Sequence, residues 1–158
     1  MNKLIKNPFS AQKGTVIALC IVLFSWSCKS KMENEVGQLS SFEGTKWKLA
    51  GIVDEQTGDI KALEPKNCEK CYTIEFETDS TFSTYSASNG FAVKYEINFE
   101  TNDIRIVELF GTEKGEIGDG DLYLEALWDL ENFSQKNNEL RLYYNGNKNY
   151  LSFKSLKK

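Results

Sequence analysis

The chain has 158 residues and contains no histidine. This absence excludes the hydrolases whose serine or cysteine nucleophile is activated by a histidine base, and nearly all acid–base sites that depend on an imidazole. The glycine-rich loops of nucleotide-binding proteins and the G-x-S-x-G turn of hydrolases are absent from the sequence as well. We therefore expect that the protein is not an enzyme, with no catalytic residue, no metal and no cofactor.

Positive charge is also scarce. The sequence carries 19 lysines and arginines against 23 aspartates and glutamates, which gives a net charge of −4 at pH 7. The basic residues form no cluster that would follow a phosphate backbone. Because an acidic chain without such a cluster is unsuited to nucleic acid, we expect no nucleic-acid partner.

Acidic side chains could in principle supply the paired carboxylates of a glycosidase. Glu75 and Glu77 stand two residues apart, in a stretch that alternates with apolar residues. This alternation is typical of a strand and places both glutamates on its polar face. We interpret them as solvated surface residues and not as a catalytic pair.

The longest apolar run lies near the N-terminus, over residues 15–26. Lys3, Lys6 and Lys13 precede it without any acidic residue, which is the arrangement of an export signal. The run is shorter than the ~20 apolar residues that a membrane-spanning helix needs. The sequence therefore predicts that the protein is exported.

The residues Ser-Trp-Ser-Cys at positions 25–28 resemble the lipobox of bacterial lipoproteins. Ser27 is the small residue required before the lipidated cysteine, whereas Cys20 follows a leucine that is too large for the signal peptidase. The resemblance implies a signal peptide over residues 1–27 and lipidation, with palmitate among the acyl chains, at Cys28. An uncleaved N-terminal anchor and a secretory signal without lipid are the alternatives.

Cleavage before Cys28 would leave residues 28–158 and remove three lysines but no acid, so the net charge would move from −4 to −7. Several acyl chains on one cysteine hold a protein stably on a bilayer, so the membrane is the first expected partner. Residues 28–43 are polar and predict a flexible tether, and residues 44–158 predict one domain. We expect the protein in the cell envelope, anchored to the outer membrane on its periplasmic face or at the cell surface.

Cys68 and Cys71 then remain as the two free thiols, and the compartment outside the inner membrane is oxidising. A metal site needs about four ligands, which a chain without histidine supplies poorly. A disulfide requires Cα atoms within about 7 Å, whereas three residues of extended strand span ~10 Å. We predict a structural disulfide with a turn over residues 67–71. Free or reversible thiols, and redox or metal chemistry, are the alternatives.

Alternation of apolar and polar residues dominates the domain and predicts about eight strands. The predicted strands lie within residues 45–53, 59–65, 71–77, 81–87, 91–99 and 104–110, and in a hairpin over 139–156. The segment 104–110 is apolar on both faces, which indicates a central strand. Successive hairpins of this kind close into an antiparallel barrel, which removes exposed edges.

One short helix is predicted within residues 121–133. Its expected apolar face contains Leu124, Leu127 and Trp128 and continues to Glu131, because these positions follow a helical period. A helix of two or three turns is favoured there over a strand. It falls near the start of the C-terminal third of the chain.

Residues 44–76 and 140–154 together resemble a group of small Bacteroidetes lipoproteins with lipocalin-like or META-type β-barrel domains. The features they share are a Gly-x-x-Trp opening strand, at Gly44 and Trp47, and an L-x-L-Y-Y terminal hairpin that begins at Leu140. The resemblance implies an antiparallel, eight-stranded lipocalin-like barrel and a lipid anchor. It implies no activity and no functional residue.

Two functional classes follow from this fold. The first is a non-catalytic binding module that holds a small apolar or aromatic ligand in the mouth or interior of the barrel. Tyr95 would then line a partly open cavity, because the small residues of 81–88 predict some internal space. The second is an interaction protein, such as an inhibitor or accessory lipoprotein, that uses its outer surface and the loop over residues 111–121 to contact an envelope protein.

That loop concentrates Glu116, Asp119 and Asp121 among glycines. Oxygen-rich loops can hold calcium, although the spacing here differs from that of an EF-hand. A mobile surface loop is the interpretation that the composition favours. A calcium site and a partner-binding loop are the alternatives.

Overall fold

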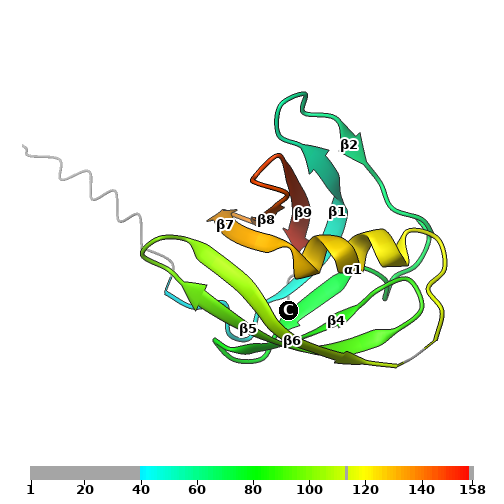
Figure 1. Cartoon of the computed structure of the whole chain (residues 1–158), viewed down its shortest axis with the longest axis horizontal. Coiled ribbons are helices and arrows are strands. Elements are labelled where there is room, and N and C mark those ends of the chain that lie inside the picture. The colour runs from blue at the N-terminus through cyan, green and yellow to red at the C-terminus, as the bar shows by residue number, and fades with distance from the viewer. Residues whose placement is uncertain (1–39, 113, 157–158) are drawn as a thin grey trace, which may run out of the picture. The chain divides into compact units, whose positions relative to one another are not determined.

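The computed structural model describes residues 40–112 and 114–156. They form one antiparallel sheet and one helix, which confirms the predicted all-β fold with a short helix (Figure 1). The elements are β1 (Lys46–Asp54), β2 (Ile60–Lys61), β3 (Thr73–Phe76), β4 (Thr81–Tyr85), β5 (Gly90–Asn98), β6 (Asp103–Gly111), α1 (Gly120–Trp128), β7 (Leu130–Lys136), β8 (Glu139–Tyr144) and β9 (Asn149–Ser155). The strands follow the order β2-β1-β3-β4-β5-β6-β7-β8-β9, and a further pairing of β1 with β9 closes the sheet into a ring.

β5 shows why the alternating segments become strands. Val93 and Tyr95 are buried, whereas Lys94 and Glu96 beside them are exposed. Because successive side chains of a strand point to opposite faces, one face meets the core while the other meets water. The predicted inward face of this strand is thus confirmed.

β2 is shorter than the sequence predicts. Of the stretch 59–65, only Ile60–Lys61 pairs with β1, and the chain then leaves the sheet as Leu63 turns into the core. Gly51 of β1 permits the close approach of β2, because a Cβ at this position would lie 2.7 Å from the carbonyl oxygen of Lys61.

β7 is a ninth strand where the sequence predicts eight. Its pairing with β8 contains a bulge, because Leu130 pairs with Tyr144 and Asn132 pairs with Tyr143, which leaves Glu131 as an extra residue. The extra residue of a bulge interrupts the regular alternation of side chains between the two faces of the strand. The alternation that identifies a strand is therefore interrupted, and the sequence assigns the start of β7 to the predicted helix instead.

Aromatic side chains fill the interior of the ring. Phe76 of β3 and Phe82 of β4 lie 5.3 Å apart between ring centroids, and Tyr95 of β5 lies 5.5 Å and 5.4 Å from them. These three side chains are at most 2% exposed. Rings at such separations stabilise a core beyond the burial of their surface. The prediction that Tyr95 lines a partly open cavity is wrong, since its ring meets other rings.

Phe42 joins this cluster from the segment before β1. Its ring centroid lies 4.8 Å from that of Phe76 and 5.1 Å from that of Phe133, and its side chain is 1% exposed. The domain therefore begins before Gly44, and the last residues of the predicted tether over 28–43 belong to the folded part.

α1 occupies the space that the small residues of β4 leave. The Tyr123 ring is 0% exposed, and its hydroxyl lies 2.7 Å from Oγ1 of Thr84, with which it shares a hydrogen bond. The small residues of 81–88 do provide internal space as predicted, but a side chain of the same protein fills it. Every buried side-chain polar atom in the described part of the chain has a hydrogen-bond partner.

The helix predicted within 121–133 is confirmed, but only part of its predicted face is buried: Leu127 is, whereas Trp128 is not. Tyr123 and Leu127 point into the core, whereas Trp128 is 52% exposed and Glu131 lies in β7. The hydroxyl of Tyr123 finds an interior partner, so this residue can be buried, and its position rotates Trp128 outward. Hydropathy alone favours burial of Trp128 and exposure of Tyr123.

Candidate functional site

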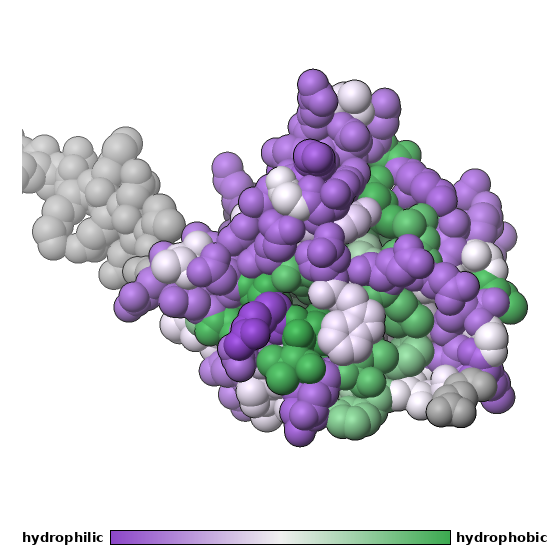
Figure 2. Space-filling view, in the orientation of Figure 1, coloured by the Kyte–Doolittle hydropathy of each residue, from purple (hydrophilic) through white to green (hydrophobic). Residues whose placement is uncertain are grey.

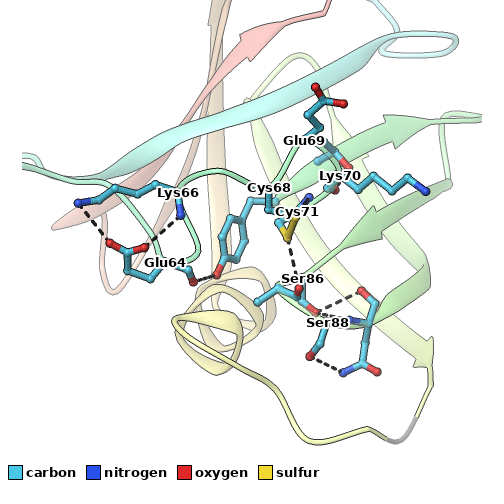
Figure 3. Close-up of a disulfide and its surroundings, with 12 residues drawn as sticks. Glu64, Lys66, Cys68, Glu69, Lys70, Cys71, Ser86 and Ser88 are labelled. Carbon is cyan, nitrogen blue, oxygen red and sulfur yellow. Dashed lines mark hydrogen bonds and ion pairs between the residues drawn. A yellow bond between two sulfur atoms is a disulfide. The ribbon is translucent and has the colours of Figure 1, made fainter.

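The predicted lipidation site, Cys28, lies outside the described residues. Cys68 and Cys71 are joined by a disulfide with a Cα–Cα distance of 5.4 Å, as predicted (Figure 3). This distance is within the range that a disulfide requires and is reached through a turn directly before β3. Cys71 is 3% exposed, so an external thiol has little access to its sulfur.

Lys48 of β1 fixes the turn by hydrogen bonds to its backbone. Its ammonium group donates to the carbonyl oxygens of Cys68 at 2.7 Å, of Glu69 at 3.3 Å, and of Cys71. Burial lowers the pKa of Lys48, although the carboxylate of Glu69 acts to raise it. The ammonium group and the disulfide fix the same turn, which supports a structural role for the cysteine pair.

The loop over residues 111–121 is tied to the domain at two points. The carboxylate of Glu116 accepts hydrogen bonds from the hydroxyls of Ser86 at 2.6 Å and Ser88 at 3.0 Å, and from the side-chain amide of Asn89. Although burial acts to raise the pKa of Glu116, these hydrogen bonds lower it below its ordinary value. The interpretation as a plain mobile loop is therefore wrong for the described part of this segment.

Asp119 makes the second tie. It accepts from the ammonium of Lys61 and from the backbone N–H of Glu64, both at 2.8 Å, and these two contacts lower its pKa. Glu116 and Asp119 thus use their oxygens on different partners. Within residues 40–112 and 114–156, no three metal-ligating side chains converge on one point. The loop does not have the geometry of a calcium site.

Glu75 lies on the exposed face of β3, as predicted. Its carboxylate pairs with the ammonium of Lys46 at 2.8 Å, and both side chains are about half exposed, at 49% and 46%. Glu77 is also exposed and follows the end of β3. Neither glutamate faces a cavity with the other, so the interpretation as surface residues is consistent with the structure.

The outer side of β6 is unpaired along most of its length. β6 pairs with β5 over its whole length, but it pairs with β7 only where Asp103 meets Asn132. α1 packs beside the strand instead (Figure 1). Folded proteins often cover a strand edge with a helix or loop, and α1 takes that place beside β6.

Val107 lies on the outer side of β6, at a bulge in the strand. Tyr95 pairs with Ile106 and Lys94 with Glu108, so Val107 is an extra residue with no partner in β5. Bulges often redirect a side chain beside a functional site. Val107 is 42% exposed and continues the outward-facing row of Asp103 and Arg105, so an apolar side chain stands on the solvent side of the strand.

β6 and α1 both carry apolar side chains that are exposed or half-buried. Phe110 is 59% and Trp128 52% exposed, and Leu109 and Leu124 are half-buried. We call the set Val107, Leu109, Phe110, Leu124 and Trp128 the α1–β6 face. Figure 2 shows hydrophobic surface on this side of the molecule, over α1 and β6, with hydrophilic surface around it. A contiguous exposed apolar surface with a polar border is typical of an interaction site.

A groove of about 380 Å³ adjoins the α1–β6 face at the junction of β5, β6 and β7. Ile97, Ile104 and Leu130 supply its apolar lining. Its charged and polar lining consists of Glu96, Asn98, Asp103, Arg105 and Glu131. The groove is therefore an apolar floor with a largely acidic rim.

Negative charge predominates around the face and the groove. The acidic side chains of β6, α1 and the start of β7 are Asp103, Glu108, Asp121, Glu125, Asp129 and Glu131. The nearby cations are already paired, since Lys94 lies 2.7 Å from the carboxylate of Glu108 and Arg105 lies 2.5 Å from that of Glu96. The surface therefore favours a ligand with positive charge.

The sequence does not identify this site. It predicts that segment 104–110, apolar on both faces, is a central strand, whereas β6 pairs with β7 at one position only and Val107 and Phe110 are exposed. The one available signal is the pair Ile106-Val107, two apolar residues in succession within an alternating strand, which is compatible with a bulge. The position of the neighbouring helix, which completes the α1–β6 face, follows only from the tertiary structure.

The nine residues of α1 are too few to cross a bilayer, and the described residues contain no other helix that is long and apolar enough to do so.

Comparison with known proteins gives a relative that matches most of the chain. The chain is 31% identical over 138 residues to a candidate lipoprotein of Tannerella forsythia, and the alignment covers 87% of this chain and 90% of that protein. No family model matches the sequence.

Two solved structures have a similar fold. A crystal structure of a DUF4847 family protein from Bacteroides vulgatus superposes with a TM-score of 0.60 at 17% identity, over 74% of this chain and 96% of the other. An NMR structure of a protein from Burkholderia xenovorans gives 0.57 at 18% identity, over 73% and 84%. At these identities the likeness concerns the fold.

Proposed function

This chain belongs to the same family as the Tannerella forsythia lipoprotein, and on that premise we propose that it is a lipid-anchored, non-catalytic binding protein of the bacterial envelope. The signal peptide would be residues 1–27 and the lipidated residue Cys28, with the outer membrane as the site of attachment. The kinship with a lipoprotein and the lipobox-like residues before Cys28 support this anchor. The absence of histidine supports a role without catalysis.

The resemblance of residues 44–76 and 140–154 to lipocalin-like, META-type domains leads us to assign the ring to that class of barrel. The closure of the sheet through the pairing of β1 with β9 is compatible with this assignment. In contrast to a typical ligand-carrying barrel, the interior holds the rings of Phe76, Phe82 and Tyr95. A ligand would therefore bind at the surface.

The binding surface in this proposal is the α1–β6 face, and its partner is an apolar segment of another envelope protein. The observation that carries the proposal is the exposure of Val107, Phe110 and Trp128 on neighbouring elements of a protein whose interior is filled. Leaving three such side chains in water is unfavourable, by about 25 cal/mol for each Å² that a partner could cover.

The acidic border decides among the possible occupants. A second copy of this chain would bring like charges together, and an anionic membrane surface would be repelled in the same way. A protein segment that carries basic residues beside apolar ones satisfies both parts of the surface. The association rate should then fall as the salt concentration rises.

Site-specific photo-crosslinking in the host envelope tests the proposal. A photoreactive phenylalanine at position 110 should give a discrete adduct, and the same residue at position 60 should not, although Ile60 is 60% exposed on β2. The adduct from position 110 should disappear with Trp128→Ser and persist with Ile60→Ser. Equal adducts from both positions, or an adduct that Trp128→Ser leaves unchanged, would show that the α1–β6 face is not the binding surface.

A small apolar or aromatic ligand is the second candidate, and the groove is the observation that favours it. Its volume of about 380 Å³ falls in the range of roughly 300–1,000 Å³ that small-molecule sites have. Native mass spectrometry of protein isolated from the host envelope would detect a retained ligand. A mass that equals that of the lipidated polypeptide alone would reject this candidate.

A further inference from the structure

We infer that the groove beside the α1–β6 face receives the side chain of a lysine or arginine from the partner segment. This inference rests on the proposed function, because it concerns the part of the partner that extends past the apolar face. A lysine or arginine side chain has an apolar stem and a cationic end. The groove has the matching parts in the same order, an apolar floor and an acidic rim.

The floor is suited to the stem of such a side chain. Ile97 is only partly buried and offers apolar surface to a ligand, while Ile104 and Leu130, 1% and 4% exposed, form the closed base behind it. These residues come from three different strands, so the floor lies where β5, β6 and β7 meet. Methylene groups that settle on it would leave water without displacing any polar contact.

The rim is held in place by hydrogen bonds within the protein. Asp103 accepts from the side-chain amide of Asn132 at 2.8 Å and from the hydroxyl of Thr101. Glu131 accepts from the backbone N–H of Gly146 at 2.8 Å through Oε1. Contacts that fix a carboxylate before binding reduce the conformational entropy that a ligand must remove.

Some oxygens of the rim remain available. Among the described residues, Oε2 of Glu131 and Oε1 of Glu96 make no hydrogen bond, since the partners of these residues use the other oxygen. With Asp103 they place three carboxylates around the groove against one guanidinium, that of Arg105. The rim thus keeps a net negative charge after its internal ion pair has formed.

Arg105 shows that a guanidinium fits this environment. Its Nη2 and Nε atoms donate to Glu96 at 2.5 Å and 2.9 Å, and its side chain is 69% exposed. A metal ion is a poorer match, because no three carboxylates in residues 40–112 and 114–156 are close enough to share one. An extended organic cation can reach separate carboxylates where an ion cannot.

The groove and the α1–β6 face are continuous along β6. Asp103, Arg105 and Val107 stand two residues apart in sequence, and all three are exposed. A segment that covers Val107 therefore has Arg105 and the rim as its next neighbours. An apolar residue followed closely by a basic one is the pattern that this surface would select.

The probe for the test is the capped pentapeptide Ac-Gly-Val-Lys-Val-Gly-NH2, titrated into the folded, 15N-labelled protein. Matched peptides replace the lysine by norleucine, which keeps most of the stem and removes the charge, or by glutamate. We expect saturable shifts of the amide resonances of Ile97, Ile104 and Leu130 with the lysine peptide. The norleucine peptide should bind about threefold to fivefold more weakly, since one exposed ion pair contributes up to about 1 kcal/mol.

Glu131→Gln keeps the acceptor for the N–H of Gly146 and removes the charge, so it should weaken the lysine peptide by about threefold. Glu77→Gln, an exposed carboxylate outside the groove, is the matched control and should have no effect. Equal affinity of the lysine and norleucine peptides would overturn the inference, as would shifts outside the groove or none up to 10 mM peptide.

The two proposals fail in different ways. If the adduct from position 110 depends on Trp128 while the lysine preference is absent, the α1–β6 face is the binding surface and the groove is not a pocket for a basic side chain. If no adduct forms at the face, the proposed function itself is rejected. The lysine peptide then has no partner segment to represent.

Discussion

Replacement of Tyr95 separates a filled interior from a ligand cavity. Its side chain is 2% exposed, its ring lies within 5.5 Å of those of Phe76 and Phe82, and its hydroxyl donates to the carbonyl oxygen of Thr78 at 2.9 Å. Burial raises the pKa of Tyr95, so the hydroxyl stays protonated at all ordinary pH values and remains a donor. Ring and hydroxyl contribute separately to stability.

The magnitude follows from these two parts. Tyr95→Phe removes only the hydrogen bond and should lower the free energy of unfolding by about 1 kcal/mol. Tyr95→Ala removes the ring as well and leaves a cavity among the aromatic side chains, so the loss should be about 3–5 kcal/mol. Tyr85→Ala is the matched control, since Tyr85 is 50% exposed at the end of the neighbouring strand. Its cost should stay within about 0.5 kcal/mol.

Urea unfolding followed by tryptophan fluorescence measures all three variants, provided that the slope against denaturant concentration is unchanged. The wild type should not take up an apolar fluorescent probe in its interior. A loss below about 2 kcal/mol for Tyr95→Ala, together with probe uptake by the wild type, would refute the close-packed core. In that case the ring would enclose space and the ligand-carrying interpretation would return.

The remaining predictions concern the anchor, the disulfide and the loop before α1. Cys28→Ala should release the protein from the membrane fraction or stall it as a precursor, and a wild-type protein that incorporates no labelled palmitate would contradict the lipid anchor. Serine at both Cys68 and Cys71 should lower the free energy of unfolding by about 2 kcal/mol or less, because the closed loop is short; disulfide-exchange activity of the wild type towards a model substrate would contradict the structural role. Glu116→Gln should cost about 1–2 kcal/mol at pH 7 and reduce the loss of stability in acid. The pKa of Glu116 is depressed in the folded state, so its contribution is present above the ordinary value of 4.5 and is lost as the pH falls through the depressed one. An unchanged slope of stability between pH 6 and 3 in this variant would contradict that linkage.

The parts of the fold that depend on local pattern could be predicted from the sequence. β5 alternates without interruption, and the pair Asn145-Gly146 marks the turn between β8 and β9, where both residues have positive φ angles, of 56° and 62°. The Cα atoms of Cys68 and Cys71 would lie too far apart for a disulfide if the chain between them were extended. A disulfide between them therefore requires a turn. In each case the local structure is determined by residues that are close together in the sequence.

Other parts depend on contacts that a single segment does not contain. The bulges at Val107 and Glu131 each add one residue to a ladder, and their positions are set by the partner strand. In the sequence, Glu116 has the character of a solvated residue in a glycine-rich loop. In the fold, it accepts hydrogen bonds from the hydroxyls of Ser86 and Ser88, which are distant in sequence. The sequence predicts the chemistry of these residues but not their neighbours.

Tyr123 illustrates the same limit inside the core. The amphipathic pattern of residues 121–133 favours Leu124 and Trp128 as buried residues, because they are more apolar than tyrosine. The fold instead buries Tyr123, whose hydroxyl is satisfied by Thr84, 39 residues away in sequence. A choice between two helical faces is thus decided by one distant hydroxyl group.

Phe42 determines how a mechanical load on the proposed lipid anchor would enter the domain. Between a lipid at Cys28 and the Phe42 ring, the chain can extend to at most about 50 Å. Tension along it would act first on a side chain packed against Phe76 and Phe133, and then on β1, which starts four residues later. The core would resist before any strand is pulled.

β1 is also the strand on which closure of the ring depends, because it pairs with β3 at one side and with β9 at the other. A pull along β1 would shear these hydrogen bonds together, whereas a pull across it would break them one after another. The direction in which the membrane holds the domain would therefore set its mechanical strength. A load that removes β1 would open the ring on both sides at once.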